Sequence, residues 1–120
     1  MPFKNLEEIS DFEKRRSKRG HQRGLELEDM VEKILNELVE EKIILNFERH
    51  RRRSREDYDG KDFTMVVADA EEKEIKISFG VTTSQRRWKE AKWLHRNIPQ
   101  FCFSQINPHN IKIKIKEFLK

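Results

Sequence analysis

Two stretches of strand-forming residues on either side of a short polar turn constrain the fold more than any other feature of this chain. The first runs from Asp62 to Ala68 and the second from Glu74 to Thr83, with residues 70–73 between them. In the second stretch, apolar residues alternate with polar residues or glycine, as in a strand with one buried face. The two stretches therefore predict an antiparallel hairpin with one partly open face.

A helical repeat precedes the hairpin. From Gly24 to about Glu41 the apolar residues recur at three- and four-residue steps, which predicts a helix with one buried face. The polar segment before it carries Asn5 and Glu8 at capping-box spacing and predicts a separate first helix that Gly20 ends.

Two more helices are expected after the hairpin. Ser84 is a suitable N-cap for a helix that stops before Pro99, with Trp88 on its buried face together with Ala91 and Leu94. Trp93 lies off that face and could stack or form an interface. In the C-terminal tail the alternating isoleucines also fit a strand, but Asn107-Pro108 is a cap and first-turn pair that favours a helix.

Further strands are expected at residues 42–48 and 100–106, with a charged loop after the first of these. The predicted order is α, α, β, β, β, α, β, α, which is an α/β fold with helices on both sides of a mixed four-stranded sheet. The length of 120 residues suits one domain. We assign residues 1–23 to a basic helical extension and residues 24–120 to the domain.

The composition limits the cellular environment and the partners that we expect for this chain. Charged residues make up 40% of the chain and both signs are mixed, so a net charge of +4 favours an anionic partner only weakly. Cys102 has no second cysteine to pair with, and no apolar run approaches the ~18 residues of a membrane span. These features predict a soluble, cytoplasmic protein without a membrane partner. The wealth of Lys, Arg and Glu is typical of proteins from hot environments.

Three motifs fall into one pattern. Glu28 follows Gly24 by four residues at the start of the long helix, "DGKDF" places Asp62 at the head of a strand, and "ISFGVTTS" ends the next strand. This layout resembles the PD-(D/E)xK nuclease superfamily, and in particular small archaeal Holliday-junction resolvases and related restriction-endonuclease-like proteins. The resemblance extends from about Arg23 to Ile106 and implies a restriction-endonuclease-like fold.

The resemblance also implies a metal site. In this superfamily acidic oxygens hold Mg²⁺ or Mn²⁺, which polarises the scissile phosphate and activates water, while a lysine stabilises the developing charge. Glu28 and Asp62 take two of the acidic positions. The acid-x-Lys pair falls on Gly80-Val81-Thr82, where glycine offers no ligand and threonine no charge. The sequence therefore predicts a degenerate site with weak or no metal binding.

Glu74-Ile75-Lys76 also spells acid-x-Lys in the same strand. If the turn is centred between residues 71 and 72, Asp62 lies opposite Val81, and Glu74 is then about 23 Å along the strand from it. Lys76 is about 17 Å away. Ligands of one metal ion must lie within a few ångströms of one another, so we exclude this pair from the site.

A cation on the following helix is a second alternative. Gln85, Lys89 and Lys92 share one face of that helix, and Gln85 begins it close to the expected site. We therefore include Gln85 and Lys89 among the candidate catalytic residues, with Glu28 and Asp62. Both acids also have structural explanations, because a helix start favours an acid and Asp62 can close a turn.

Two clusters of basic residues precede the candidate acids: residues 14–23 lead into Glu28, and residues 49–55 lead into Asp62. Phosphate contact is the functional interpretation, and a solvated, salt-bridged surface is the structural one. Because both clusters should lie beside the same cleft, we select phosphate contact. The candidate nucleic-acid-binding residues are Arg15, Arg16, Lys18, Arg19, Arg23, Arg49, Arg51, Arg52, Arg53 and Arg55.

Three functions remain open. The first is a nucleic-acid-binding protein, with DNA favoured over RNA, whose nuclease site is degenerate. The second is an active Mg²⁺- or Mn²⁺-dependent endonuclease or junction resolvase. The third is a protein-interaction module in which the charges only solubilise the fold. A homodimer would match the two-fold symmetry of a junction.

Overall fold

The computed structural model describes residues 6–51 and 54–120, with side chains described from Gln22 onward except at positions 57 and 58. The elements are α1 (Leu6–Glu40), β1 (Asn46–Arg49), α2 (Arg55–Tyr58), β2 (Phe63–Ala68), β3 (Glu74–Thr82), α3 (Gln85–Leu94), β4 (Gln100–Cys102) and α4 (Pro108–Phe118). They form one sheet in the order β1-β2-β3-β4, antiparallel except for the parallel pair of β3 and β4. The predicted α/β class, with a mixed four-stranded sheet flanked by helices, is confirmed.

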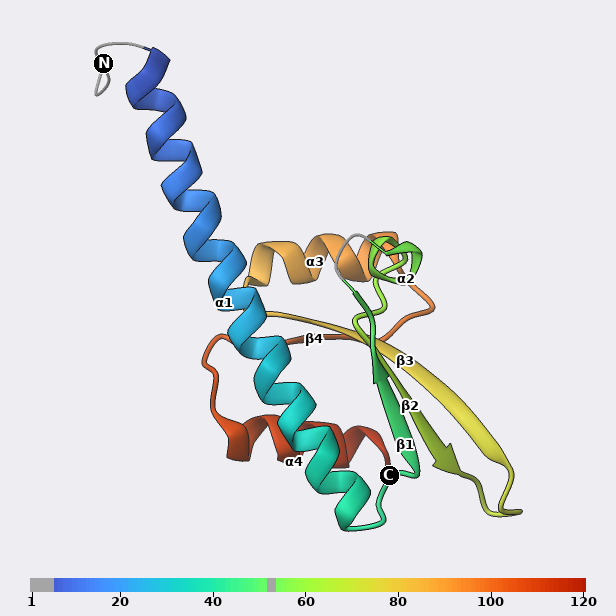
Figure 1. The fold of residues 1–120 in the computed structure, drawn as a ribbon. Helices are drawn as coiled ribbons and strands as arrows, with labels where there is room; N and C mark the ends of the chain where they lie inside the picture. Colours follow the sequence, from blue (N-terminus) through green and yellow to red (C-terminus); the bar gives the residue numbers. More distant parts are fainter. Residues whose placement is uncertain (1–5, 52–53) are drawn as a thin grey trace.

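The helices lie on two sides of this sheet. Helices α1 and α4 contact each other, and α1 also packs against β1 and β3. Helix α3 contacts β3 and β4 and lies on the other side of β4 from α4 (Figure 1). The crossover through α3 is what allows β4 to pair parallel with β3.

The core lies between α1, the sheet and α4. Its helical part is the predicted face of α1, from Leu27 to Leu38, with Ile111 and Ile115 of α4. Its strand part is mainly aromatic, and the ring of Phe79 contacts those of Phe63 and Phe101, both at 5.6 Å between centroids. Full burial of each such side chain contributes about 1.5–3 kcal/mol. The remaining core members are Val31, Ile34, Leu35, Ile44, Met65 and Phe103.

Helix α1 is one continuous helix of 35 residues, so the predicted break at Gly20 is wrong. Glycine inside a helix costs only about 1 kcal/mol relative to alanine, and the Glu, Lys and Arg residues around it are good helix formers. The assigned limit between residues 23 and 24 falls inside this helix, whose first half extends away from the sheet (Figure 1).

The end of α1 displaces the next strand. Lys42 has a left-handed φ of 60°, its N–H donates to the carbonyl of Val39 at 3.1 Å, and the N–H of Ile43 donates to that of Leu38 at 2.9 Å. This pair of bonds is a Schellman cap, with lysine where glycine is usual. Strand β1 therefore begins at Asn46 and not at the predicted residue 42.

The hairpin forms as predicted, with a register shifted by one residue. Asp69 closes the turn: its N–H donates to the carbonyl of Lys73 at 2.9 Å, and its Oδ1 accepts from the N–H groups of Glu71 and Lys73. Phe63 consequently pairs with Phe79. The predicted pairing of Asp62 with Val81 is therefore wrong by one residue. The observed register places Asp62 level with Gly80.

Other boundaries also differ. The charged loop contains one helical turn, α2, which was not predicted, and β4 ends at Cys102, well before residue 106. Two caps are confirmed: Ser84 Oγ accepts from the N–H of Arg87 at 3.3 Å, and Asn107 Oδ1 accepts from that of Asn110 at 3.3 Å.

Candidate functional site

Asp62 is tied into the head of the sheet through its carboxylate and its backbone. Its Oδ2 accepts a hydrogen bond from the N–H of Val81 at 2.8 Å. Its own N–H donates to the carbonyl of Phe79, and its carbonyl accepts from the N–H of His50, both at 2.9 Å. The carboxylate therefore fastens β2 to β3 at the level where the acid-x-Lys pair was expected.

The space beside Gly80, where the sequence resemblance places an acid, is occupied by the side chain of Gln100. Gly80 is buried, and a β-carbon added there would touch Oε1 of Gln100 and lie 2.6 Å from the carbonyl oxygen of Gly60. Gln100, the first residue of β4, is held in place because its Nε2 donates to that same carbonyl at 2.9 Å. An acid at position 80 would need the space that this amide occupies.

Gly60 has a structural requirement of its own. Its φ is +82°, a left-handed value that glycine adopts without strain. A β-carbon there would lie 2.5 Å from Cδ2 of His95. Two glycines and one amide thus make a close-packed junction between the start of β2, the end of β3 and the start of β4.

Thr82, where the sequence resemblance places a lysine, is the last residue of β3 and leads into the turn before α3. Thr82 Oγ1 accepts from the N–H of Ser84 at 3.2 Å, and the carbonyl of Thr82 accepts from the N–H of Phe103 at 2.8 Å. Thr82 thus has a local structural role that needs no charge.

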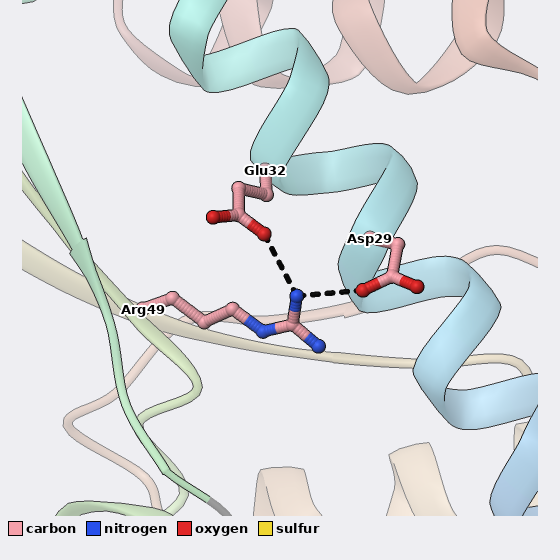
Figure 2. A network of polar contacts seen from close by, with 3 residues as sticks. All are labelled: Asp29, Glu32 and Arg49. Atoms are coloured by element: carbon pink, nitrogen blue, oxygen red, sulfur yellow. Dashed lines mark hydrogen bonds and ion pairs between the residues drawn. The ribbon is translucent and has the colours of Figure 1, made fainter.

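Glu28 lies on α1 and is 5% exposed. Its charge acts on Arg49, whose Nη1 contacts Asp29 Oδ1 at 2.7 Å and Glu32 Oε2 at 2.8 Å (Figure 2). Burial lowers the pKa of Arg49, but the hydrogen bonds to Asp29 and Glu32 and the nearby charges of Glu28 and Asp29 outweigh it, so that pKa is raised. Arg49 links β1 to α1 with its guanidinium held by two carboxylates.

Gln85 and Lys89, the two candidate catalytic residues on α3, line different hollows. Gln85 lines a cavity of about 470 Å³, which it shares with Gln100 and Cys102 among others. Lys89 lines a second hollow of about 490 Å³ on the outer side of α3. Trp88 borders both.

The outer hollow has aromatic and basic walls. The indole Nε1 of Trp88 donates to the carbonyl of Gln100 at 2.9 Å, and the ammonium of Lys92 lies 4.4 Å from the centroid of that ring. Trp93 is 68% exposed, with the guanidinium of Arg96 at 5.8 Å from its ring centroid. Trp93 therefore lies off the buried face, as predicted.

The predicted burial of Leu94 in α3 is wrong, and the contribution of Arg96 to the hollow was not predicted. Leu94, assigned to the buried face, is 64% exposed, whereas Trp88 and Ala91 are half-buried. Arg96 was not among the candidates. Its spacing of three residues from Trp93 was the available signal.

The basic clusters are only partly described. Arg15, Arg16, Lys18 and Arg19 are on the projecting half of α1, and their side chains lie outside the described residues, as do Arg52 and Arg53 entirely. Arg23 donates from Nη2 to the carbonyl of Ser104 at 2.9 Å, and Arg51 and Arg55 are exposed.

Among the described residues, no group of three or more His, Cys, Asp or Glu side chains is placed to hold a metal ion. None of the helices in the described ranges combines the length and apolar character that a membrane crossing requires. Comparisons with protein-family models, curated proteins and solved structures found no match.

Proposed function

We propose that this protein has a restriction-endonuclease-like fold and binds nucleic acid. Its metal site is degenerate, so it no longer cuts the nucleic acid that it binds. The observation that carries the proposal is the contact of Gln100 with Gly80, because it fills the acid position of the nuclease motif with a neutral amide. The order α1, three antiparallel strands, α3 and a parallel β4 supports the same fold that the sequence resemblance implies.

Loss of cutting follows from the chemistry of the position. A metal-dependent nuclease needs several acidic oxygens around its ions to polarise the phosphate and activate water. Here Asp62 retains a carboxylate, Gly80 supplies none, and Thr82 supplies no cation. Mg²⁺ or Mn²⁺ would therefore have to bind through Glu28 and Asp62 with an incomplete set of acids.

Retention of binding is supported by cations outside that position. Arg51 and Arg55 are exposed beside the start of β2, and α3 carries four basic residues and one acid. Lys and Arg on such surfaces release counterions when they contact phosphates, so the affinity should fall as salt rises. DNA is the favoured partner over RNA, and a homodimer would suit a two-fold symmetric junction.

The test measures retention and cutting in the same samples. Labelled duplex, single-stranded and four-way-junction DNA, and RNA, are mixed with the protein at low salt in EDTA, Mg²⁺ or Mn²⁺. We expect salt-sensitive retention without cutting, and weaker retention when Arg51, Arg52 and Arg53 are all replaced by Gln. A protein with Lys73, Lys76 and Lys116 replaced by Gln loses the same charge elsewhere and should bind nearly normally.

Two results would overturn the proposal. Metal-dependent cutting that Asp62→Asn abolishes while binding persists would identify an active nuclease, and the missing cation would then be sought at Gln85 and Lys89. Absence of binding to every probe at low salt would favour the interaction module instead.

A further inference from the structure

We infer that the outer side of α3 binds unpaired nucleotides of a single-stranded nucleic acid, with a base stacked on Trp93 and phosphates held by the neighbouring cations. This α3 surface is formed by Trp88, Lys89, Lys92, Trp93 and Arg96. The inference rests on the proposed function and deepens it by naming the class of nucleic acid.

Four of the five residues form two adjacent rows on α3, and Arg96 lies just beyond its C-terminal end. Trp88 and Lys92 are four residues apart, as are Lys89 and Trp93, and Arg96 follows Trp93 by three. The rows meet over the hollow of about 490 Å³. Each aromatic ring therefore has a cation beside it, which is the combination that single-strand-binding grooves use.

The two indoles are placed differently. Trp88 is fixed by its hydrogen bond to the carbonyl of Gln100, and its ring is covered by Lys92. Trp93 is 68% exposed, and Arg96 lies near the outer limit of cation–π contact, about 6 Å. Trp88 thus forms a fixed wall, and Trp93 offers the ring on which a base can stack.

The charge of the surface selects an anionic occupant. Within the described part of the chain, none of Lys89, Lys92 and Arg96 forms an ion pair, and the acid of α3, Glu90, pairs with Arg86 at 3.6 Å. Three cations that pair with no carboxylate among the described residues, beside the exposed indole of Trp93, complement a chain that carries both phosphates and aromatic bases. An acidic peptide would satisfy the cations but would leave Trp93 without a stacking partner.

Whether the bases are paired determines whether they can stack on Trp93. In a duplex the faces of the bases are already stacked on one another, so a protruding indole meets the sugar-phosphate backbone. An unpaired base can turn its face to the ring, and each such contact strengthens binding markedly. The α3 surface should therefore prefer a single strand, or the unpaired region of a branched structure, to a continuous duplex.

The experiment compares fluorescein-labelled oligo-dT with a labelled duplex by fluorescence anisotropy at low salt. We expect Trp93→Ala to weaken oligo-dT binding about tenfold and duplex binding far less. Trp93→Phe keeps a ring and should retain much of the affinity. Because Trp93 is largely exposed, neither change should disturb folding, which circular dichroism checks. Adding Lys89→Gln and Arg96→Gln to Trp93→Ala should weaken oligo-dT binding further. Adding Lys76→Gln and Lys116→Gln instead should have little effect.

Each outcome decides a different statement. If oligo-dT binds and Trp93→Ala changes nothing, or changes duplex binding equally, the stacking surface is overturned, and the proposed function stands. If neither probe binds the unmodified protein, both fail. Loss of oligo-dT binding in Trp93→Ala, with recovery in Trp93→Phe, would support the assignment.

Discussion

Gln100 Nε2 donates to the carbonyl oxygen of Gly60 at 2.9 Å, and this bond holds the Gln100 side chain against Gly80. Three segments that are distant in the sequence meet there. The contact gives Gly80 a packing function, and its energetic contribution can be measured.

Gly80→Ala should destabilise the fold by about 1–3 kcal/mol, because a β-carbon would collide with the amide of Gln100 and lie 2.6 Å from the Gly60 carbonyl. Gln100→Ala alone removes the hydrogen bond to the Gly60 carbonyl, worth about 1 kcal/mol, and a longer one to the carbonyl of Ile98 at 3.4 Å. The double variant should lose less than the sum of the two, since the amide no longer opposes the methyl group. Chemical denaturation measures all three. Lys76→Ala, at an exposed position of the same strand, is the control, and strict additivity would contradict the packing.

Arg49→Met should destabilise the protein by about 1–2 kcal/mol, since Asp29 and Glu32 lose their shared cation. The loss should be the same at pH 7 and at about pH 10. The pKa of Arg49 is raised above the already high value of a free guanidinium, so the stabilising charge is fully present at both pH values and fades only at still higher pH. Urea unfolding at both pH values tests this. A penalty that disappears at the higher pH, or is matched by Arg51→Met, would contradict the pairing.

Cys102 should react with iodoacetamide several-fold more slowly in the native protein than in denaturant. Burial raises the pKa of its thiol above the usual 9.0, which lowers the fraction of reactive thiolate at pH 8. Mass spectrometry of timed samples gives the rate. A small free thiol in each buffer corrects for solvent effects, and equal corrected rates would show that the thiol is not shielded.

Local signals in the sequence were sufficient for much of the fold. The caps at Ser84 and Asn107 and the buried face of α1 each depend on neighbouring residues, and the structure contains them. The alternation predicted for β3 is found only in part: Phe79 is buried, but Ile75 is 44% exposed and Gly80 is buried. The continuity of α1 was missed because one glycine was taken as a helix end, although its cost is small beside that of starting a second helix.

The site depended on longer-range relationships. The register placed Asp62 beside Val81 because the turn was taken as symmetric about residues 71 and 72, whereas Glu72 adopts a left-handed φ of 62° and Asp69 bonds across the turn. Gln100 carries no local signal at all. Only the parallel pairing of β4 with β3 brings it onto Gly80, and nothing in the sequence around residue 100 indicates that contact.

That parallel pairing is short, and its shortness has a consequence for self-association. Strand β4 pairs with β3 only at Gly80–Thr82, so among the described strands only β2 pairs with the preceding half of β3 (Figure 1). An uncovered strand edge is a template for pairing with another molecule. Glu74 and Lys76 are exposed there, on either side of Ile75, which is 44% exposed. The opposite charges of Glu74 and Lys76 disfavour the pairing of that edge with another molecule.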